Sequence, residues 1–296
     1  MVSDKRLRTA NLDWGDDSAA PGAPRSVVFD DIYFSGDGPA ETEHVFLHGN
    51  DLPARFQSAQ LFSIGELGFG AGLNFLSAWD CWRNTNKPPH AKLSFFSVEA
   101  FPLTPADLCR AHARWPQFAE LSRKLIDVYP PAHPGFHHLH LDDDVSLTLF
   151  FGDALAGLSS AEAAIDAWFL DGFSPAKNPE MWRAEVMEEV ARLSKPHTTF
   201  ATFTVAGGVR RRLQSAGFEI EKRPGYGRKR EMLVGRLRED RSLTRRKPWY
   251  ATHHSSPARP GARIAIIGAG IAGASMAHAL RQVGMTPIVL EARTPA

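Results

Sequence analysis

An acidic residue followed by a tight turn ends one of the most apolar segments of the chain. Residues 167–170 are Ala-Trp-Phe-Leu, and they lead directly into Asp171 and the sequence Gly-Phe-Ser-Pro. The apolar run predicts a buried strand, and open α/β sheets bind ligands at the carboxyl ends of their strands. We therefore expect Asp171 and Phe173 to lie at a ligand site, and we take them as the candidate catalytic residues.

A glycine-rich loop about a hundred residues earlier supplies the second half of this candidate site. It follows an apolar strand at 61–64 and precedes a helical pattern at 73–82. Glycines at such a turn let the backbone approach a ligand closely, but the Lys-Ser/Thr pair of a phosphate-binding P-loop is absent. An acid just before the glycines suits S-adenosylmethionine, which has a zwitterionic amino-acid tail and no phosphate. The candidate cofactor-binding residues here are Glu66, Gly68, Gly70, Gly72 and Asn74.

Acidic residues also follow the other predicted strands. Glu99 ends a strand at 93–98, where a carboxylate can accept hydrogen bonds from both ribose hydroxyls of a nucleoside. Asp153 ends a strand at 146–151, beside the expected position of the adenine. Asp171 belongs to this group as well. The alternative is that each acid only caps the helix that follows it. The four strand-end acids, which are these three and Glu66, together with the glycine loop favour a cofactor site.

Strands and helices alternate along the chain and must position these residues. Such alternation predicts an α/β fold with a mostly parallel sheet and helices on both faces. Before it, apolar stretches at 26–34 and 43–47 flank a Ser-Gly-Asp-Gly-Pro sequence, which predicts an N-terminal β-hairpin. Segments at 218–221 and 231–237 could form an antiparallel pair at the end of the sheet.

Composition and cysteine usage bound the class of protein. The chain has 296 residues, 43% of them hydrophobic, which leaves room for one large or two modest domains. Cys81 and Cys109 form no disulfide framework, and the charged N-terminus lacks the apolar core of a signal peptide, so we expect a cytoplasmic protein without a membrane span. The histidines, including His137, His138 and the pair at 253–254, show no metal-site spacing and are interpreted as loop residues.

Basic residues are concentrated in one part of the chain. Residues 1–204 carry 16 Lys and Arg against 27 Asp and Glu, whereas residues 205–250 carry 14 against 5. This asymmetry indicates a polyanionic partner such as RNA, although a solvated helix and a charged linker would look the same. The candidate RNA-binding residues are Lys177, Arg210, Arg211, Arg212, Tyr226, Arg228, Lys229 and Arg230.

A second glycine loop lies near the end of the chain. Gly268, Gly270 and Gly273 follow a strand directly, and Glu291 lies 21 residues after Gly270, which is the full fingerprint of a dinucleotide-binding unit. We expect a methyltransferase domain at 1–238, a linker at 239–261 and a partial βαβ unit at 262–296. About 35 residues cannot build the surfaces of an oxidase, so we expect neither flavin binding nor oxidase activity from this chain.

Four segments resemble the methyltransferase half of the MnmC family, which comprises bifunctional proteins that make 5-methylaminomethyl-2-thiouridine at the wobble position of tRNA. They are residues 65–75 (GELGFGAGLNF), 96–103 (FSVEAFPL), 168–182 (WFLDGFSPAKNPEMW) and 225–233 (GYGRKREML). The resemblance covers about residues 10–238 and implies a Rossmann-like methyltransferase that uses S-adenosylmethionine and acts on an aminomethyl-uridine in tRNA. It also implies that the second glycine loop begins an FAD-dependent oxidase half.

Three functions remain open from the residues alone. A methyltransferase accounts for the glycine loop and the Asp171 turn, where Asp171 would orient an amine and Phe173 would stack on a base or plug the core. An oxidoreductase accounts for the second glycine loop only, and a non-catalytic RNA-binding module accounts for the basic block only. The sequence does not fix the oligomeric state, and a monomer is the simpler expectation.

Overall fold

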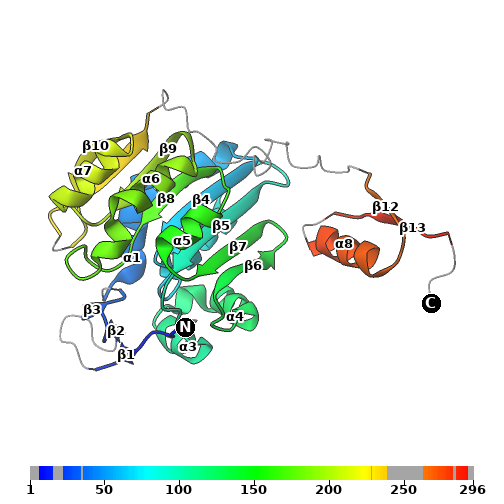
Figure 1. The fold of residues 1–296 in the computed structure, drawn as a ribbon, viewed down its shortest axis with the longest axis horizontal. Coiled ribbons are helices and arrows are strands. Elements are labelled where there is room, and N and C mark those ends of the chain that lie inside the picture. The colour runs from blue at the N-terminus through cyan, green and yellow to red at the C-terminus, as the bar shows by residue number, and fades with distance from the viewer. Residues whose placement is uncertain are drawn as a thin grey trace, which may run out of the picture.

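The computed structural model describes residues 7–15, 23–34, 36–227, 229–238, 263–282 and 285–292. Its main body is an eight-stranded sheet with the strand order β10-β11-β9-β8-β4-β5-β7-β6 (Figure 1). The strands are β4 (Leu61–Leu67), β5 (Lys92–Glu99), β6 (Gly135–Asp142), β7 (Val145–Phe151), β8 (Ile165–Leu170), β9 (Ser194–Thr202), β10 (Phe218–Pro224) and β11 (Glu231–Leu237). The α/β fold predicted from the alternating pattern is confirmed.

The five central strands, from β7 to β9 in this order, are parallel, and β6, β11 and β10 add antiparallel neighbours. Parallel strands end at the same edge, so the ends of β4, β5 and β8 lie side by side. Gly65 in β4 pairs with Trp168 in β8, and a Cβ at Gly65 would lie 2.5 Å from the Trp168 ring. Only glycine fits there, because the indole covers the backbone of the neighbouring strand.

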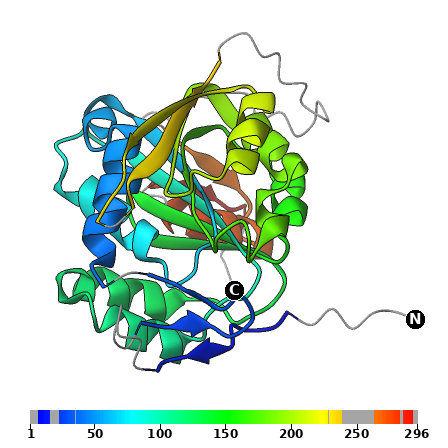
Figure 2. The same cartoon turned by 90° about the vertical axis from the view of Figure 1, so that its left-hand side faces the viewer.

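Helices form a layer on each side of the sheet (Figure 2). The helices are α1 (Gly38–Thr42), α2 (Leu73–Asn84), α3 (Pro105–His112), α4 (Ala119–Val128), α5 (Ala154–Ser160), α6 (Ala184–Arg192) and α7 (Gly207–Ser215). Helices α2, α3 and α4 share one hydrophobic core, and α5, α6 and α7 share the other. Trp168 and Phe169 face opposite cores because side chains alternate along a strand. The apolar run before Asp171 is therefore buried on both faces.

The N-terminal hairpin prediction is wrong in its second arm. The structure has a small three-stranded antiparallel sheet of β1 (Leu12–Asp13), β2 (Arg25–Ser26) and β3 (Asp31–Ile32), and residues 43–47 form a helical turn that continues α1. Pro39 lies in the first turn of α1, where its fixed backbone angle favours a helix. The consecutive residues Val45, Phe46 and Leu47 are all buried, which an alternating strand with one solvated face would not allow.

The interpretation of His137 and His138 as loop residues is also wrong, because both lie in β6 at the edge of the sheet. The ring of His138 makes a 2.8 Å hydrogen bond to Thr148 Oγ1 on β7, and the ring of His137 lies 4.9 Å from that of Phe151. An edge strand with one partly solvated face accepts such polar side chains.

Near the end of the chain, β12 (Ala265–Ile267), α8 (Ile271–Gln282) and β13 (Ile288–Leu290) form the predicted strand–helix–strand unit. The two strands are parallel, and β12 and β13 pair only with each other within the described residues. Gly273 is required by close packing, since a Cβ there would lie 1.8 Å from the carbonyl oxygen of Gly268.

Candidate active site

A cavity of about 430 Å³ lies at the carboxyl ends of β4, β5 and β8. The glycine loop after β4, residues 99–101 after β5 and the turn after β8 form three of its walls. Residues from two N-terminal segments, 29–34 and 38–42, also line it, and further lining comes from Phe46, Leu73, Asn74, Asn178, Met181, Phe203 and Lys229. The position is the ligand-binding edge of an open α/β sheet, and the volume is typical of small-molecule sites.

The glycine loop adopts backbone conformations that favour glycine. Gly68, Gly70 and Gly72 have φ angles of +80°, +53° and +72°. A Cβ at Gly68 would lie 3.3 Å from the Cα of Gly172, so the loop packs closely on the turn that follows Asp171. Gly68 and Gly70 line the cavity, whereas Gly72 directly precedes α2 outside the lining.

Glu99 hydrogen-bonds both the glycine loop and the segment that follows β5, and both line the cavity. Its Oε2 accepts a hydrogen bond from the Gly70 N–H at 2.8 Å, and its Oε1 accepts one from the Phe101 N–H at 2.8 Å. The side chain lines the cavity and is 9% exposed, and its burial raises the pKa of the carboxyl group. Each oxygen keeps a second lone pair, so the geometry is compatible with the predicted contact to ribose hydroxyls.

Asn74 joins the glycine-loop side of the site to Asp171. Its Nδ2 donates hydrogen bonds to Asp171 Oδ2 at 2.7 Å and to Glu66 Oε1 at 3.0 Å. Its Oδ1 accepts one from the Thr42 hydroxyl at 2.9 Å, and the Ser97 hydroxyl donates to Glu66 Oε2 at 2.6 Å. Burial raises the pKa of Glu66 well above its usual value, against the effect of these hydrogen bonds. Glu66 thus accepts a hydrogen bond from Asn74 but does not itself line the cavity. Its contact with the cofactor stays a prediction.

Asp171 is a partly buried titratable group of the cavity. Burial raises its pKa to about 6. Hydrogen bonds from the Gly172 N–H and the Asn74 amide oppose this rise, as does the charge of Lys229, whereas Glu41 adds to it. A positive charge placed in the cavity would favour the ionised carboxylate.

We expect the affinity for S-adenosylmethionine to decrease below pH 6. The pKa of Asp171 is about 6 in the free protein, and the sulfonium favours the carboxylate, so binding at lower pH must take a proton off Asp171. The affinity should be constant near pH 8 and should fall by up to about tenfold per pH unit below pH 6. Calorimetric titrations in two buffers of different ionisation enthalpy measure both the affinity and the proton release. Asp171→Asn should remove this dependence, and an unchanged wild-type affinity from pH 5 to pH 8 would contradict the assignment.

Aromatic side chains form a further wall of the cavity, which reaches the glycine loop at Tyr33. The ring of Phe173 lies 4.8 Å from that of Phe29 and 5.0 Å from that of Tyr33, and Phe29 lies 5.6 Å from Phe101. All four residues line the cavity. Phe173 therefore faces the ligand space and does not only fill the core.

Asp153 lies outside the cavity lining. Its side chain accepts a hydrogen bond from the Ala156 N–H at 3.1 Å and so caps α5, as the alternative interpretation of the strand-end acids proposed. It also lies 3.0 Å from the guanidinium of Arg183. The predicted contact of Asp153 with adenine stays a prediction.

Lys177 contacts acidic residues of the N-terminal sheet. Its Nζ hydrogen-bonds the carbonyl oxygen of Asp30 and lies 3.8 Å from Asp31 Oδ1. Whether it also contacts RNA stays a prediction, since a phosphate would have to compete with these groups.

Two other candidate RNA-binding residues contact α1. The Tyr226 hydroxyl donates to Asp37 Oδ2 at 2.7 Å. Lys229 Nζ lies 2.5 Å from Glu41 Oε1 and 4.2 Å from the centre of the Phe203 ring. Lys229 also lines the cavity, so the segment between β10 and β11 forms part of its rim.

The remaining basic candidates differ in exposure. Arg211, Arg212 and Arg230 are exposed and Arg210 is half-buried. The Arg212 guanidinium donates to the carbonyl oxygen of Trp182 at 2.9 Å. Arg228 lies outside the described residues.

The sequence did not point to several residues of the N-terminal segment that line the cavity. They are Phe29, Asp31, Tyr33, Glu41 and Thr42. No local pattern could have identified them, because their proximity to Asp171 depends on long-range packing. The only signal was the run of aromatic and acidic residues at 29–34.

The second glycine loop keeps its geometry within the βαβ unit. Glu291 Oε2 accepts a hydrogen bond from the Ala269 N–H at 2.7 Å, and Gly268 has a φ of +97°. Elsewhere in the described residues no three His, Cys, Asp or Glu side chains are grouped to hold a metal. Nor does any described helix combine the length and apolarity needed to cross a membrane.

Comparison with known proteins agrees with this geometry. The profile of a family described as S-adenosyl-L-methionine-dependent methyltransferase matches residues 116–238. The MnmC protein of Hydrogenovibrio crunogenus, a tRNA 5-methylaminomethyl-2-thiouridine biosynthesis bifunctional protein, is 45% identical over 97% of this chain and 42% of its own length. That of Stutzerimonas stutzeri is 46% identical over 97% of this chain and 43% of its own length. The chain thus spans about two-fifths of these curated relatives.

A solved structure supports the fold. The MnmC2 protein of Aquifex aeolicus superimposes with a TM-score of 0.62 at 22% identity, covering 77% of this chain and 71% of that one. Residues 116–238 therefore match the S-adenosyl-L-methionine-dependent methyltransferase family, and the chain as a whole is similar to about two-fifths of the MnmC proteins.

Proposed function

We propose that this chain transfers a methyl group from S-adenosylmethionine to the primary amine of 5-aminomethyl-uridine, or its 2-thio form, at the wobble position of tRNA. The observation that carries the proposal is the position of Asp171 in one cavity between the glycine loop and the aromatic wall. The acceptor nucleoside is inferred from the relatives, whose names specify the biosynthesis of 5-methylaminomethyl-2-thiouridine in tRNA.

The residues that line the cavity fit the cofactor. Gly68 and Gly70 line the cavity and have no side chain to fill it, and Glu99 offers two oxygens to the ribose. Asn74 and Asp171 would face the amino-acid end. When bound, the cofactor supplies an electrophilic methyl group on a positively charged sulfur.

The role that we assign to Asp171 is orientation and charge stabilisation. As the N–C bond forms and the S–C bond breaks, positive charge moves from the sulfur to the amine nitrogen. A carboxylate that accepts hydrogen bonds from the amine stabilises this charge and aligns the lone pair. Because a carboxylate also stabilises the protonated amine before reaction, we propose that the proton leaves to water and that the nearby sulfonium favours its departure.

Phe173 is the proposed stacking surface for the uracil ring. Bases extruded from an RNA loop are commonly stacked on aromatic side chains. Phe173 is at the cavity surface next to Asp171 and is supported from behind by Phe29 and Tyr33. A ring stacked there would carry its aminomethyl group toward the carboxylate.

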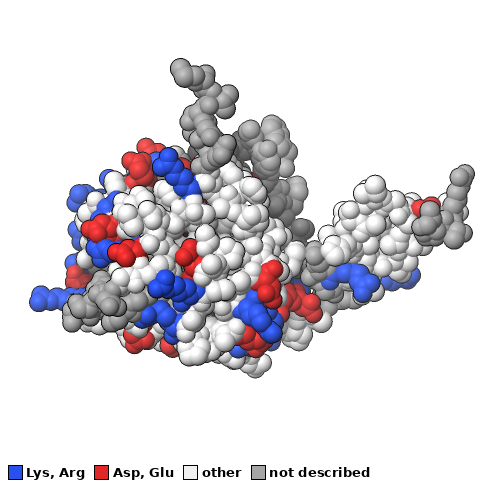
Figure 3. Space-filling model, turned by 90° about the horizontal axis from the view of Figure 1, so that it is seen from below, with Lys and Arg blue, Asp and Glu red and all other residues white. Residues whose placement is uncertain are grey.

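Helix α7 is the proposed contact for the tRNA backbone. It begins with Gly207 and Gly208 and makes no side-chain N-cap hydrogen bond, and the N-terminus of a helix favours a phosphate. The guanidinium of Arg211 lies 3.3 Å from where a Cβ of Gly207 would be. On the face seen in Figure 3, the basic and acidic side chains drawn in colour are interleaved, so this view shows no continuous basic surface.

Replacing Arg210 and Arg211 by glutamine should weaken tRNA binding and lower the slope of log affinity against log salt by about one to two. Each arginine that contacts a phosphate releases counterions on binding, so its loss reduces the salt dependence. Filter binding at several salt concentrations measures the slope. Arg123→Gln on α4 is the matched control and should change neither quantity. Equal effects of the two variants would count against α7.

The domain boundaries, the second glycine loop and the location are part of the proposal. We propose a methyltransferase domain at 1–238, a linker at 239–261 and a unit at 262–296 that resembles the start of an FAD-binding domain. The hydrogen bond from Ala269 to Glu291 supports the nucleotide-binding fingerprint of this unit. A cytoplasmic location would accord with a tRNA substrate. Flavin absorbance of the purified protein tests the expectation that the chain does not bind FAD.

The direct test is methyl transfer from radiolabelled S-adenosylmethionine to tRNA from cells that lack this modification activity. Nucleoside analysis should find the label in 5-methylaminomethyl-uridine or its 2-thio form. If the cofactor binds and the tRNA stays unlabelled, the proposed acceptor is wrong for this chain. A non-catalytic RNA-binding module is the less favoured alternative, because it leaves the cavity and the methyltransferase relatives unexplained.

A further inference from the structure

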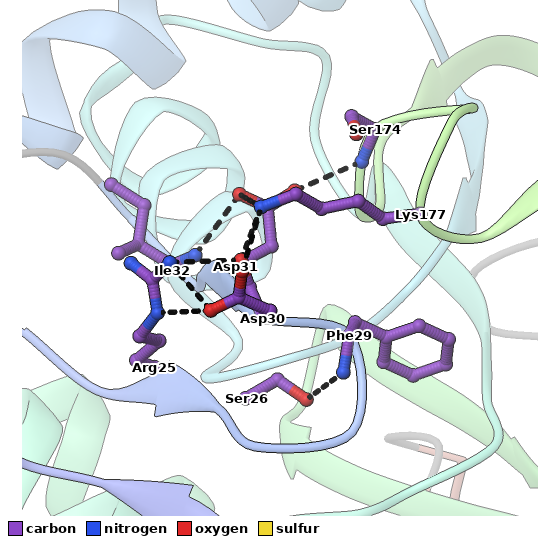
Figure 4. Close-up of polar contacts among 8 residues, drawn as sticks. All are labelled: Arg25, Ser26, Phe29, Asp30, Asp31, Ile32, Ser174 and Lys177. Atoms are coloured by element: carbon purple, nitrogen blue, oxygen red, sulfur yellow. Dashed lines mark hydrogen bonds and ion pairs between the residues drawn. The ribbon is translucent and has the colours of Figure 1, made fainter.

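The turn that carries Phe173 is attached to a hairpin from the N-terminal end of the chain. The N-terminal hairpin consists of β2, β3 and the turn at residues 27–30 between them. Asp31 Oδ2 accepts a hydrogen bond from the Ser174 N–H at 3.1 Å, directly after Phe173. Lys177 reaches back to the same hairpin and hydrogen-bonds the Asp30 carbonyl (Figure 4). The two segments are more than 140 residues apart in sequence, as the separation of 143 between Asp31 and Ser174 shows.

The hairpin turn itself is braced. The Arg25 guanidinium donates to Asp30 Oδ1 at 2.7 and 2.9 Å, and the Ser26 hydroxyl accepts from the Phe29 N–H at 3.2 Å. Phe29 then packs 4.8 Å from the ring of Phe173. The hairpin therefore contacts the Phe173 turn at the backbone through Asp31, at Lys177 through Asp30, and at the ring through Phe29.

The Phe173 turn is also held by contacts within its own segment, besides the packing of Gly172 on the glycine loop and of the Phe173 ring on Tyr33. Ser174 O accepts from the backbone N–H groups of Lys177 and Asn178, each at 2.9 Å, which closes the turn on itself. The Trp182 indole N–H donates to Phe173 O at 2.9 Å. These bonds shape the turn locally, whereas Asp31 joins it to a separate element across the cavity.

We propose that Asp31 is a positioning residue for methyl transfer: it holds the Ser174 N–H and Lys177 so that Phe173 is aligned to receive the acceptor ring. This inference takes its substrate from the proposed function. The contact between Asp31 and the Phe173 turn does not depend on that function. Asp31 acts through Phe173, and the cofactor side of the cavity, with Glu99 and the glycine loop, does not depend on it.

Kinetics separate a positioning role from a structural one. Asp31→Ala should lower kcat for tRNA methylation by about 10- to 100-fold, because a small displacement of the acceptor disrupts alignment, and should leave the affinity for S-adenosylmethionine unchanged. Asp31→Asn should recover much of this activity, since an amide oxygen can still accept from Ser174. Lys177→Gln should add little to Asp31→Ala, because both act on one turn. Asp127→Ala on α4 is the control.

A spectroscopic readout makes the coupling testable without catalysis. With 4-fluorophenylalanine at position 173, Asp31→Ala should shift or broaden the ¹⁹F resonance, and Asp127→Ala should not. If the wild-type chain were inactive, the proposed function would be rejected. The ¹⁹F resonance would still show whether Asp31 positions Phe173. The proposal is overturned if Asp31→Ala changes neither the resonance nor kcat, or if cofactor affinity and melting temperature fall together with kcat. It is also overturned if Asp31→Asn is as inactive as Asp31→Ala while its resonance is normal, since Asp31 would then contact the substrate directly.

Discussion

Asp171→Asn is expected to lower the rate of methyl transfer by about 100- to 1,000-fold, the range found when a preorganised group that stabilises transition-state charge is removed. The carboxylate accepts hydrogen bonds through both oxygens, from Gly172 N and from Asn74 Nδ2. An asparagine has one acceptor oxygen, so its amide nitrogen would face a donor, and it carries no negative charge for the developing ammonium. Single-turnover transfer from labelled S-adenosylmethionine measures this step apart from product release.

Asp143→Asn provides the matched control, because Asp143 is an exposed acid between β6 and β7 and does not line the cavity. Its rate should equal that of the wild type. A rate for Asp171→Asn within a few-fold of wild type would show that Asp171 is not essential and that the site is misassigned. If cofactor binding were lost completely while the chain stayed folded, Asp171 would be a binding residue first.

Asn74→Ala is expected to reduce the free energy of unfolding by about 2–5 kcal/mol and to abolish cofactor binding. The change removes three hydrogen bonds at once and takes the Asn74 donor away from the buried carboxylate of Glu66 and the partly buried one of Asp171. Losing a partner of a buried carboxylate costs far more than losing an exposed hydrogen bond. Because the Asn74 amide lowers the pKa of Asp171, that pKa should also rise further. Denaturant titration and calorimetry measure the two effects.

Asn84→Ala tests the same substitution on the same helix. Asn84 lies at the end of α2, and its amide donates to Asp80 Oδ2 at 3.1 Å in an exposed position. Asn84→Ala should lower the free energy of unfolding by at most about 0.5 kcal/mol. If the two variants lost equal stability, helix propensity would explain both, and the proposed role of Asn74 as a bridge would be rejected.

Much of the fold could be predicted from local patterns. Thr104 and Pro105 predict the start of α3, and the Thr104 hydroxyl does accept a hydrogen bond from the Asp107 N–H at 3.2 Å. Helices of this kind form where capping and apolar spacing agree. The hairpin error at 43–47 shows the limit. A short apolar run does not show whether hydrophobic residues repeat as in a helix or as in a strand. Here the run packs against β9 and Phe169 as a helical turn.

The sequence by itself determined that a glycine loop and the Asp171 turn meet at one sheet edge, because parallel strands end together wherever apolar runs and turns alternate. It also favoured S-adenosylmethionine as the cofactor, since an acid before the glycines and the absence of a P-loop lysine both disfavour a phosphate. Only the tertiary structure decided what completes the site. Asn74 bridges two carboxylates, Asp153 caps a helix, and Lys177 joins the hairpin that holds Phe29. These contacts join residues far apart in the chain, and side-chain pairing over such distances depends on packing that no local pattern encodes.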